Sequence, residues 1–371
     1  MNQKAKPIES LPKDRLLSLD FFRGITMFLL IGESAGIYHY MVDPSLKGSV
    51  IWFLGNQLHH HPWNGLHFWD LVQPFFMFIV GVAIPFSVAK RQRQGQKPRE
   101  LLKHAVSRSV LLLIFGWALY CIGPGKITFY FQNVLAQLSV TYIVAFLIRN
   151  KSFSFQLVLS LVLIGISEVL YRTFPVEGFN HPFVANQNFG TWLDLQYGGA
   201  DLRGHWVSFN AIPTTAHTIW GVLAGKLLLS EKTPRQKVRA LAIAGLIGII
   251  AGYALNPLTP IIKRIATSSF VIVSGGWALL VLAASYWLID MKKSRKWVIF
   301  FAVVGMNPLF IYLFANVGGS GFLEHIIIPF TKGLFGWTGE VNLRIITSLL
   351  VWTILWYITW WMYKQKIFIK I

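Results

Sequence analysis

The sequence has few of the residues that charge or cross-link a soluble protein. Cysteine occurs once among 371 residues, at Cys121, so neither a disulfide framework nor a cluster of thiolate metal ligands can form. Asp and Glu together number 15 against 34 Lys and Arg, and charged residues make up only 13% of the chain. Soluble domains of this size are rarely so poor in charge. The hydrophobic content of 54% therefore predicts an integral membrane protein.

Long apolar stretches indicate the fold class. A membrane-spanning helix needs about 20 mostly apolar residues. Ten stretches meet this requirement: 19–40, 67–89, 105–123, 131–148, 153–171, 208–229, 238–256, 265–290, 297–317 and 343–363. They use most of the chain, so we predict an all-α polytopic membrane protein with about ten transmembrane helices and a single domain over 1–371. The apolar run 322–334 is broken by Pro329 and Lys332, which favours a re-entrant or interfacial segment.

The net charge of +19 is explained by orientation in the membrane. If the N-terminus is cytoplasmic and the ten spans alternate, most Lys and Arg residues fall in the inner segments, as the positive-inside rule requires. We therefore expect both termini in the cytoplasm, a lipid bilayer as surroundings and no nucleic-acid partner. Basic inner segments such as 90–93 can also attract anionic lipids or an anionic cofactor. The first apolar stretch has no cleavage site after it, so we expect it to be retained as the first span of a multi-pass inner (plasma) membrane protein.

The residues most suited to chemistry follow one another between the first two spans. Three histidines at 59–61 run into Trp63 and Asn64, and Asp70 follows at the start of a long apolar stretch. Imidazole can deprotonate a nucleophile or accept an acyl group, and a nearby carboxylate fixes its tautomer. Trp63 can stack on a sugar ring, and Asn64 can bind sugar hydroxyls. Consecutive histidines rarely direct three ligands to one ion, so we predict no metal.

Charged residues interrupt the first span. Asp20 and Arg23 are three residues apart and share one face of a helix, where they form either an ion pair or, through Arg23, a contact to a phosphate. We treat both as candidate cofactor-binding residues. Glu33 lies ten residues beyond Arg23, in the outer half of the same span. A carboxylate at membrane depth is expected to face the interior of the bundle, so Glu33 is a candidate substrate-binding residue.

Two polar residues stand out in later spans. His217 lies among threonines in the sixth span, where an interhelical hydrogen bond is its default role and cofactor binding is the alternative. Asn307 stands between Gly305-Met306 and Pro308 in the ninth span. Such neighbours can open helical backbone where it lines a cavity, so Asn307 is a second candidate for substrate binding.

Three motifs occur in an order that resembles the transmembrane acyltransferases typified by heparan-α-glucosaminide N-acetyltransferase. They are S-L-D-F-F-R-G at 18–24, H-H-P-W-N-G at 60–65 and D-L-V-Q-P-F-F-M-F-I-V-G at 70–81. Weaker matches at 134–142, 221–226 and 304–309 extend the resemblance over nearly the whole chain.

The resemblance implies that acetyl-CoA is used from the cytoplasmic side and that a sugar amine is acetylated on the far side. The essential histidine of the middle motif corresponds to His60, and we expect Asp70 to orient a nearby imidazole. The expected function is thus acetyl transfer to an amino sugar or oligosaccharide, most simply of the glucosamine type. A transporter or flippase and an O-acyltransferase of the same architecture are the alternatives, because a general base serves transfer to nitrogen and to oxygen. A homodimer is left open.

Overall fold

The computed structural model describes residues 16–122, 125–197, 199–294 and 297–369, and within these ranges the regular structure is entirely helical. The α-helices are α1 (Leu17–Ser34), α2 (Ile37–Met41), α3 (Val50–Gln57), α4 (Val72–Arg93), α5 (Pro98–Ile122), α6 (Val134–Ile148), α7 (Phe153–Thr173), α8 (Phe189–Gln196), α9 (Ala211–Leu229), α10 (Pro234–Leu255), α11 (Ser268–Ser285), α12 (Val298–Met306), α13 (Pro308–Phe314), α14 (Ser320–Phe335) and α15 (Glu340–Lys364). Shorter 3₁₀ or π turns are η2 (Pro44–Leu46), η3 (Phe68–Leu71), η4 (Ser208–Asn210), η5 (Tyr286–Met291), η6 (Ala315–Gly319) and η7 (Gly336–Thr338).

Seven helical segments in the described ranges are long and apolar enough to cross a membrane, which confirms the all-helical, polytopic fold class. They are Phe68–Arg93, Pro98–Ile122, Phe153–Thr173, Pro234–Leu255, Ser268–Met291, Pro308–Thr338 and Glu340–Lys364. The predicted number of ten is not confirmed. Of the remaining stretches, α1 carries Asp20, Arg23 and Glu33, α6 has only 15 residues, and α9 is rich in threonine. The single domain over 1–371 stays a prediction.

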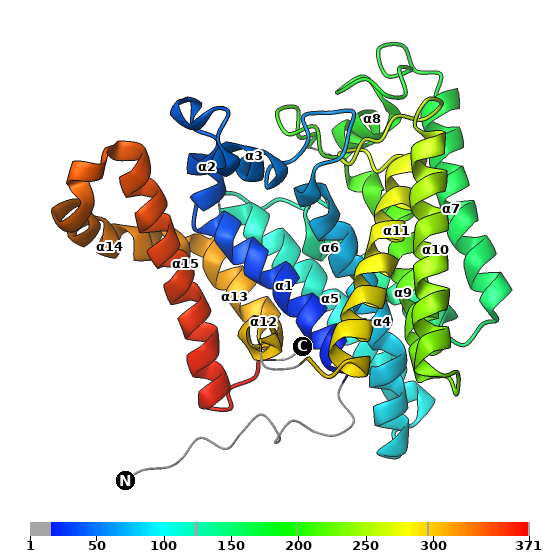
Figure 1. Cartoon of the computed structure of the whole chain (residues 1–371). Helices are drawn as coiled ribbons and strands as arrows, with labels where there is room; N and C mark the ends of the chain where they lie inside the picture. The colour runs from blue at the N-terminus through cyan, green and yellow to red at the C-terminus, as the bar shows by residue number, and fades with distance from the viewer. Residues whose placement is uncertain (1–15, 123–124, 198, 295–296, 370–371) are drawn as a thin grey trace, which may run out of the picture.

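The helices run between two ends of the molecule that differ in composition (Figure 1). The start of α1, the end of α4 and the end of α15 lie at the lower end of the view, while α3 and α8 lie at the upper end. We call the lower one the basic end, because α4 finishes there with Lys90, Arg91 and Arg93. We call the upper one the histidine end, because the 58–67 loop between α3 and η3 lies there.

Close backbone contact fixes α4 at the centre of the bundle, where it packs against α1, α9 and α11. Gly81 on α4 meets Gly221 on α9. A Cβ atom at Gly81 would lie 2.1 Å from the carbonyl oxygen of Thr218, and one at Gly221 would lie 2.2 Å from that of Phe78. Small residues let membrane helices approach closely, so these two glycines set the position of α4 against α9.

The ninth predicted span is broken, as its Gly and Pro residues suggest. Asn307 has non-helical dihedral angles (φ −125°, ψ 50°), and α13 starts at Pro308, which has no N–H to continue the ladder. A second kink occurs at Gly318, where φ is +105°. The apolar run 322–334 then forms most of α14, which lies at the edge of the bundle beside α15 (Figure 1). Its re-entrant or interfacial position stays a prediction.

Candidate active site

His60 and Asp70 form the polar centre of a cavity at the histidine end. The ring Nδ1 of His60 lies 2.9 Å from Oδ1 of Asp70. The Asp70 side chain is 1% exposed, whereas that of His60 is 29% exposed. The two residues are ten apart in sequence, and the imidazole that Asp70 was predicted to orient is that of His60 in the structure. A carboxylate at this position holds the imidazole ring in a fixed orientation.

Hydrogen bonds from the surrounding backbone hold the Asp70 side chain in place. Its second oxygen, Oδ2, accepts hydrogen bonds from the backbone N–H of His67 at 2.9 Å and of His61 at 3.2 Å. The first of these caps η3 at its N-terminus. Gly65 has φ +149°, and its Cβ would lie 2.4 Å from Nε2 of His61, so a glycine is needed for the loop to close. Both carboxylate oxygens therefore have hydrogen-bond partners, and these contacts keep the side chain beside His60.

Lys263 is a third member of this cluster that the sequence analysis did not single out. Its Nζ lies 3.1 Å from Nδ1 of His60 and 4.0 Å from Oδ1 of Asp70, and its side chain is only 6% exposed. It comes from the loop between α10 and α11, which is tied to the histidine loop by the Gly65 N–H donating to the carbonyl of Ile261 at 2.8 Å. The sequence signal was weak, since Lys263 is one of several basic residues in predicted outer loops.

An aromatic side chain covers the cluster. Trp206 meets the edge of the His60 ring at 5.1 Å between centroids. Lys263 and Arg264 place their cationic groups 5.3 and 5.5 Å from the Trp206 ring centre. Burial and the positive charges of Lys263 and Arg264 lower the pKa of His60 to about 4, against the opposing effect of Asp70. His60 is thus a neutral imidazole at physiological pH, which is the form that can accept a proton or an acyl group.

The other two consecutive histidines have different surroundings. Nδ1 of His59 lies 2.8 Å from the carbonyl oxygen of Gly55, one turn back on α3. The ring of His61 packs edge-on against that of His67, at 4.8 Å between centroids, and its buried Nδ1 has no hydrogen-bond partner among the described residues. Neither His59 nor His61 lines the cavity, so the structure singles out His60 from the three.

The histidine-end cavity has a volume of about 260 Å³. His60, Lys263 and Glu33 line this cavity, and the Glu33 side chain is exposed. Oε1 of Glu33 accepts a hydrogen bond from Nε1 of Trp69 at 3.2 Å. The sequence predicts that Glu33 faces the bundle interior, and in the structure Glu33 lines this cavity. Further polar side chains complete the lining: Gln73, Tyr120, Gln132, Asn133 and Asn316.

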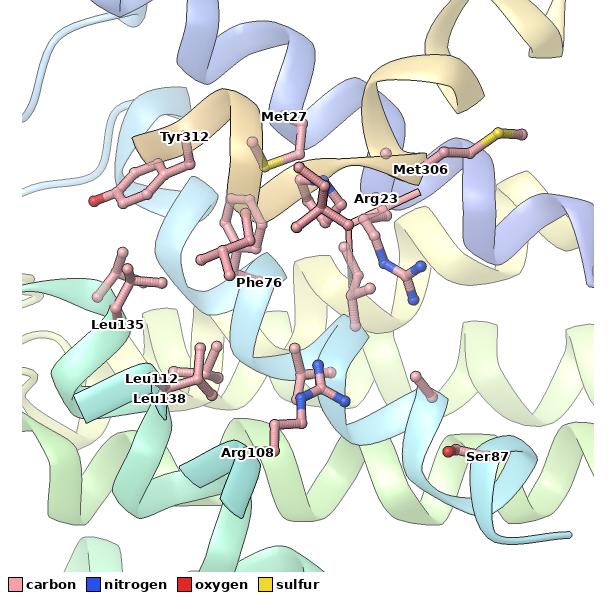
Figure 2. A pocket seen from close by; sticks show the side chains of 18 of the residues that line it. Arg23, Met27, Phe76, Ser87, Arg108, Leu112, Leu135, Leu138, Met306 and Tyr312 are labelled. Atoms are coloured by element: carbon pink, nitrogen blue, oxygen red, sulfur yellow. The ribbon is translucent and has the colours of Figure 1, made fainter. Parts of the chain in front are cut away.

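A second cavity, of about 360 Å³, opens toward the basic end. Its basic lining consists of three arginines, Arg23 from α1, Arg91 from α4 and Arg108 from α5, and His104 of α5 lies beside Arg91. Figure 2 shows the guanidinium groups of Arg23 and Arg108 directed into the space beside the apolar side chains of this cavity. The buried Nε of Arg108 has no hydrogen-bond partner in the described part of the chain.

The two cavities adjoin one another inside the bundle. Four side chains line both of them: Leu30, Phe76, Val134 and Tyr312. Tyr312 lies at the opposite side of the basic-end cavity from Ser87 in Figure 2. The cavity that holds the arginines and the cavity that holds His60 therefore share a wall, and three of its four side chains are apolar.

Asp20 and Arg23 form an ion pair, which is one of the two roles predicted for them from the sequence. Nη1 of Arg23 lies 3.8 Å from Oδ1 of Asp20. Arg23 also lines the basic-end cavity, while Asp20 is 6% exposed and lies behind it. Arg91 within the basic 90–93 segment lines the same cavity. The other two basic residues there, His104 and Arg108, were not predicted, because they fall at the inner end of an apolar stretch with no motif around them.

The remaining predicted residues lie away from both cavities. Trp63 donates from Nε1 to the carbonyl of Phe183 at 2.7 Å, and Asn64 is exposed on the loop. His217 is fully buried, with Nε2 2.9 Å from Oγ of Ser274 on α11, as an interhelical role requires. The sugar contacts of Trp63 and Asn64 and the cofactor contact of His217 stay predictions.

Asn307 has a structural partner instead. Its amide donates to the carbonyl of Ile367 at 2.9 Å and accepts from the N–H of Ile369 at 2.8 Å. Ile369 lines the basic-end cavity, as do Met306 and Pro308 beside Asn307. Asn307 thereby holds the C-terminal segment against that cavity without lining it. Among the described residues, no group of three or more His, Cys, Asp or Glu is arranged to hold a metal ion.

Comparison with known proteins decides the family. A model of the catalytic region of heparan-alpha-glucosaminide N-acetyltransferase matches residues 15–258, well over half of the chain. The chain belongs to this family. The matched region includes His60, Asp70 and the arginines of the basic-end cavity, whereas Lys263 lies beyond it.

Two curated relatives in the heparan-alpha-glucosaminide N-acetyltransferase family carry that name. The Homo sapiens protein is 27% identical over 424 residues, covering 96% of this chain and 60% of its own length. The Mus musculus protein is 26% identical over 425 residues, covering 96% of this chain and 61% of its own length. The chain thus spans about three fifths of the length of these relatives.

Proposed function

We propose that this protein is a membrane acetyltransferase that moves an acetyl group from acetyl-CoA to an amino sugar or an oligosaccharide amine. One observation carries the proposal: a cavity with a cluster of arginines at the basic end shares a wall of four side chains with the cavity of His60 at the histidine end. A transporter needs no paired imidazole and carboxylate along its path, so the His60–Asp70 pair favours transfer chemistry over transport.

The basic-end cavity fits a CoA group. Arg23, Arg91 and Arg108 would hold its phosphates, since guanidinium groups form paired hydrogen bonds to phosphate, and the free Nε of Arg108 supplies a further donor. The shared side chains Leu30 and Phe76 would line the pantetheine arm. Acetyl-CoA would supply a thioester-activated acetyl group close to the histidine end.

The residues around His60 then carry out proton transfer. In the reactive tautomer, Asp70 accepts the hydrogen of Nδ1, which leaves Nε2 with the lone pair. Nε2 has no partner among the described residues and can take the proton of an acceptor amine or accept the acetyl group itself. Both a direct transfer and a route through an acetyl-imidazole use the same atom.

The histidine-end cavity offers groups for the acceptor. The carboxylate of Glu33 can bind the ammonium form of an amino sugar, and Tyr120 and Asn316 can bind its hydroxyls. In the membrane, we propose that the basic end faces the cytoplasm of a bacterial cell and that both termini lie there. The acceptor would then be acetylated on the far side of the inner membrane.

Acetyl transfer by the purified full chain tests this proposal. Radiolabelled acetyl-CoA is incubated with glucosamine, with an oligosaccharide that has a free amine, and with N-acetylglucosamine as the control that offers only hydroxyls. We expect label on the two amines and little on the control. Label on N-acetylglucosamine at a comparable rate would mean O-transfer. Absence of both transfer and acetyl-CoA binding by isothermal titration would overturn the proposal.

A further inference from the structure

Nδ1 of His60 has two partners that require opposite protonation states. Oδ1 of Asp70 lies 2.9 Å from it and, as a carboxylate, can only accept a hydrogen bond. Nζ of Lys263 lies 3.1 Å from the same nitrogen and, as an ammonium group, can only donate. A neutral imidazole carries either a hydrogen or a lone pair on Nδ1, so it satisfies one of these partners at a time.

We infer that Lys263 is a positioning residue that selects the tautomer of His60. As an ammonium group it donates to the Nδ1 lone pair, and the imidazole hydrogen then lies on Nε2. As a neutral amine it no longer competes with Asp70, so Nδ1–H donates to the carboxylate and Nε2 carries the lone pair. Only in the second state does Nε2 carry a lone pair, and no group among the described residues contacts this nitrogen. The catalytic consequence rests on the proposed function, whereas the tautomer change itself does not.

The surroundings of Lys263 place its titration in an accessible range. Burial lowers its pKa to about 8, although Asp70 from η3 and Glu33 from α1 act in the opposite direction and Arg264 in the same direction. The ring of Trp206 lies over the ammonium group, and His60 is its remaining polar neighbour. The charged form is therefore favoured at neutral pH and is lost as the pH rises through about 8, where the Nε2 base becomes available.

Two substitutions should lock the two states. Arginine stays protonated at every accessible pH, so Lys263→Arg should keep the hydrogen of His60 on Nε2 throughout. Methionine has a similar length and no donor, so Lys263→Met should leave Nδ1–H on Asp70 throughout. Because Lys263 also lowers the pKa of His60, the imidazole in Lys263→Met should protonate at a higher pH than in the wild type. A merely structural lysine would give neither of these opposite effects.

The deciding measurement is solid-state nitrogen NMR of histidine-labelled full chain in lipid vesicles, with the His60 signals identified by their loss in His60→Gln. In the wild type we expect Nδ1 to change from lone pair to N–H as the pH rises from 7 to 9. Lys263→Arg should show the Nε2–H form and Lys263→Met the Nδ1–H form over that range. A single pH-independent tautomer in the wild type would overturn the inference, even if a variant failed to fold.

Activity gives a second, separable readout. In the wild type kcat/KM should rise about tenfold per pH unit below an apparent pKa near 8, because one proton is lost from Lys263. Lys263→Met should lose this alkaline rise, and Lys263→Arg should stay at the low level. Ionisation of the acceptor amine contributes equally to all three proteins and so cancels in their ratios. If the wild type transfers no acetyl group, the proposed function fails while the NMR result still tests the tautomer.

Discussion

At the scale of single residues, the contacts of one imidazole, that of His60, distinguish the candidate active site. His60 lines the cavity, its Nδ1 is held by Asp70, and its pKa is lowered to about 4 by burial and by Lys263. His59 and His61, its neighbours in sequence, have other partners. A run of three histidines therefore contains one candidate catalytic residue and two that shape the loop around it.

Asp70→Asn should abolish most activity while leaving the fold intact. The amide oxygen of asparagine can still accept from the N–H groups of His61 and His67, but its NH₂ then faces Nδ1 of His60 and favours the Nε2–H tautomer. At pH 9, where Lys263 is neutral and Nε2 of wild-type His60 carries the lone pair, we expect kcat to fall by roughly 10²–10⁴-fold. The exposed Glu340, paired with Arg344, provides a control in Glu340→Gln, which should keep wild-type kcat. An Asp70→Asn protein with near-normal turnover would contradict the role given to this carboxylate.

The sequence predicted the His60–Asp70 pair because motif and chemistry coincide there. It did not predict Lys263, which reaches His60 from a loop some two hundred residues later and lies in no recognisable motif. Sugar binding by Trp63 and Asn64 stays a prediction; in the structure Trp63 donates to the backbone of Phe183 and Asn64 is exposed, and neither lines the histidine-end cavity. Composition indicates what a side chain can bind, but its direction depends on loop packing across the fold.

At the scale of helices, small residues and cations set the positions that matter. Glycines bring α4 against α9, and arginines from α1, α4 and α5 converge on one cavity. The apolar runs in the sequence predicted where the helices are, because hydrophobic length is a local property. Which faces meet is decided by contacts between distant helices, so the arginine cluster could be predicted only in part, through Arg23 and the 90–93 segment.

Gly81→Ala should destabilise the helix bundle. The new methyl group would lie 2.1 Å from the carbonyl oxygen of Thr218, and such overpacking costs about 1–3 kcal/mol. We expect a lower Tm in detergent by differential scanning fluorimetry. Gly165→Ala on α7 is the matched control, since its Cβ would meet nothing within 4 Å and alanine favours the helix, so its Tm should be unchanged or slightly higher. Equal Tm values for the two variants would show that α4 and α9 are not in close contact.

Arg108→Gln should weaken binding of acetyl-CoA more than it slows transfer. Loss of one charge-assisted contact to phosphate typically costs about 1.5–3 kcal/mol, so we expect Kd to rise roughly tenfold or more with a small change in kcat. Arg99→Gln on the same helix is the control, because Arg99 is exposed and does not line the cavity. Isothermal titration with acetyl-CoA compares them, and equal Kd values for the two variants would remove the basic-end cavity as the CoA site.

At the scale of the whole molecule, the two ends have different tasks. The basic end carries the terminal residues of α4 and α15 and the arginine-lined cavity, and the histidine end carries the loops that hold His60 (Figure 1). The proposed transfer across a membrane requires the basic end to face the cytoplasm. That orientation is predicted by the distribution of Lys and Arg along the sequence.

Cysteine labelling of intact cells can test the orientation. In a Cys121→Ser background, Ser45→Cys lies before α3 at the histidine end and Gln94→Cys lies after α4 at the basic end; both native side chains are exposed. A membrane-impermeant maleimide should label position 45 in intact cells and position 94 only after the cells are opened. Labelling of position 94 but not of position 45 in intact cells would reverse the topology.

The central claim is that His60 performs the transfer while acetyl-CoA is held by other residues. It is tested most directly by measuring acetyl transfer and acetyl-CoA binding on the same preparations of wild type, His59→Ala, His60→Ala and His61→Ala. We predict that His60→Ala binds acetyl-CoA with near wild-type Kd but loses at least roughly 10²–10⁴-fold in kcat, and that the other two variants are milder. Near-normal turnover by His60→Ala would contradict the account.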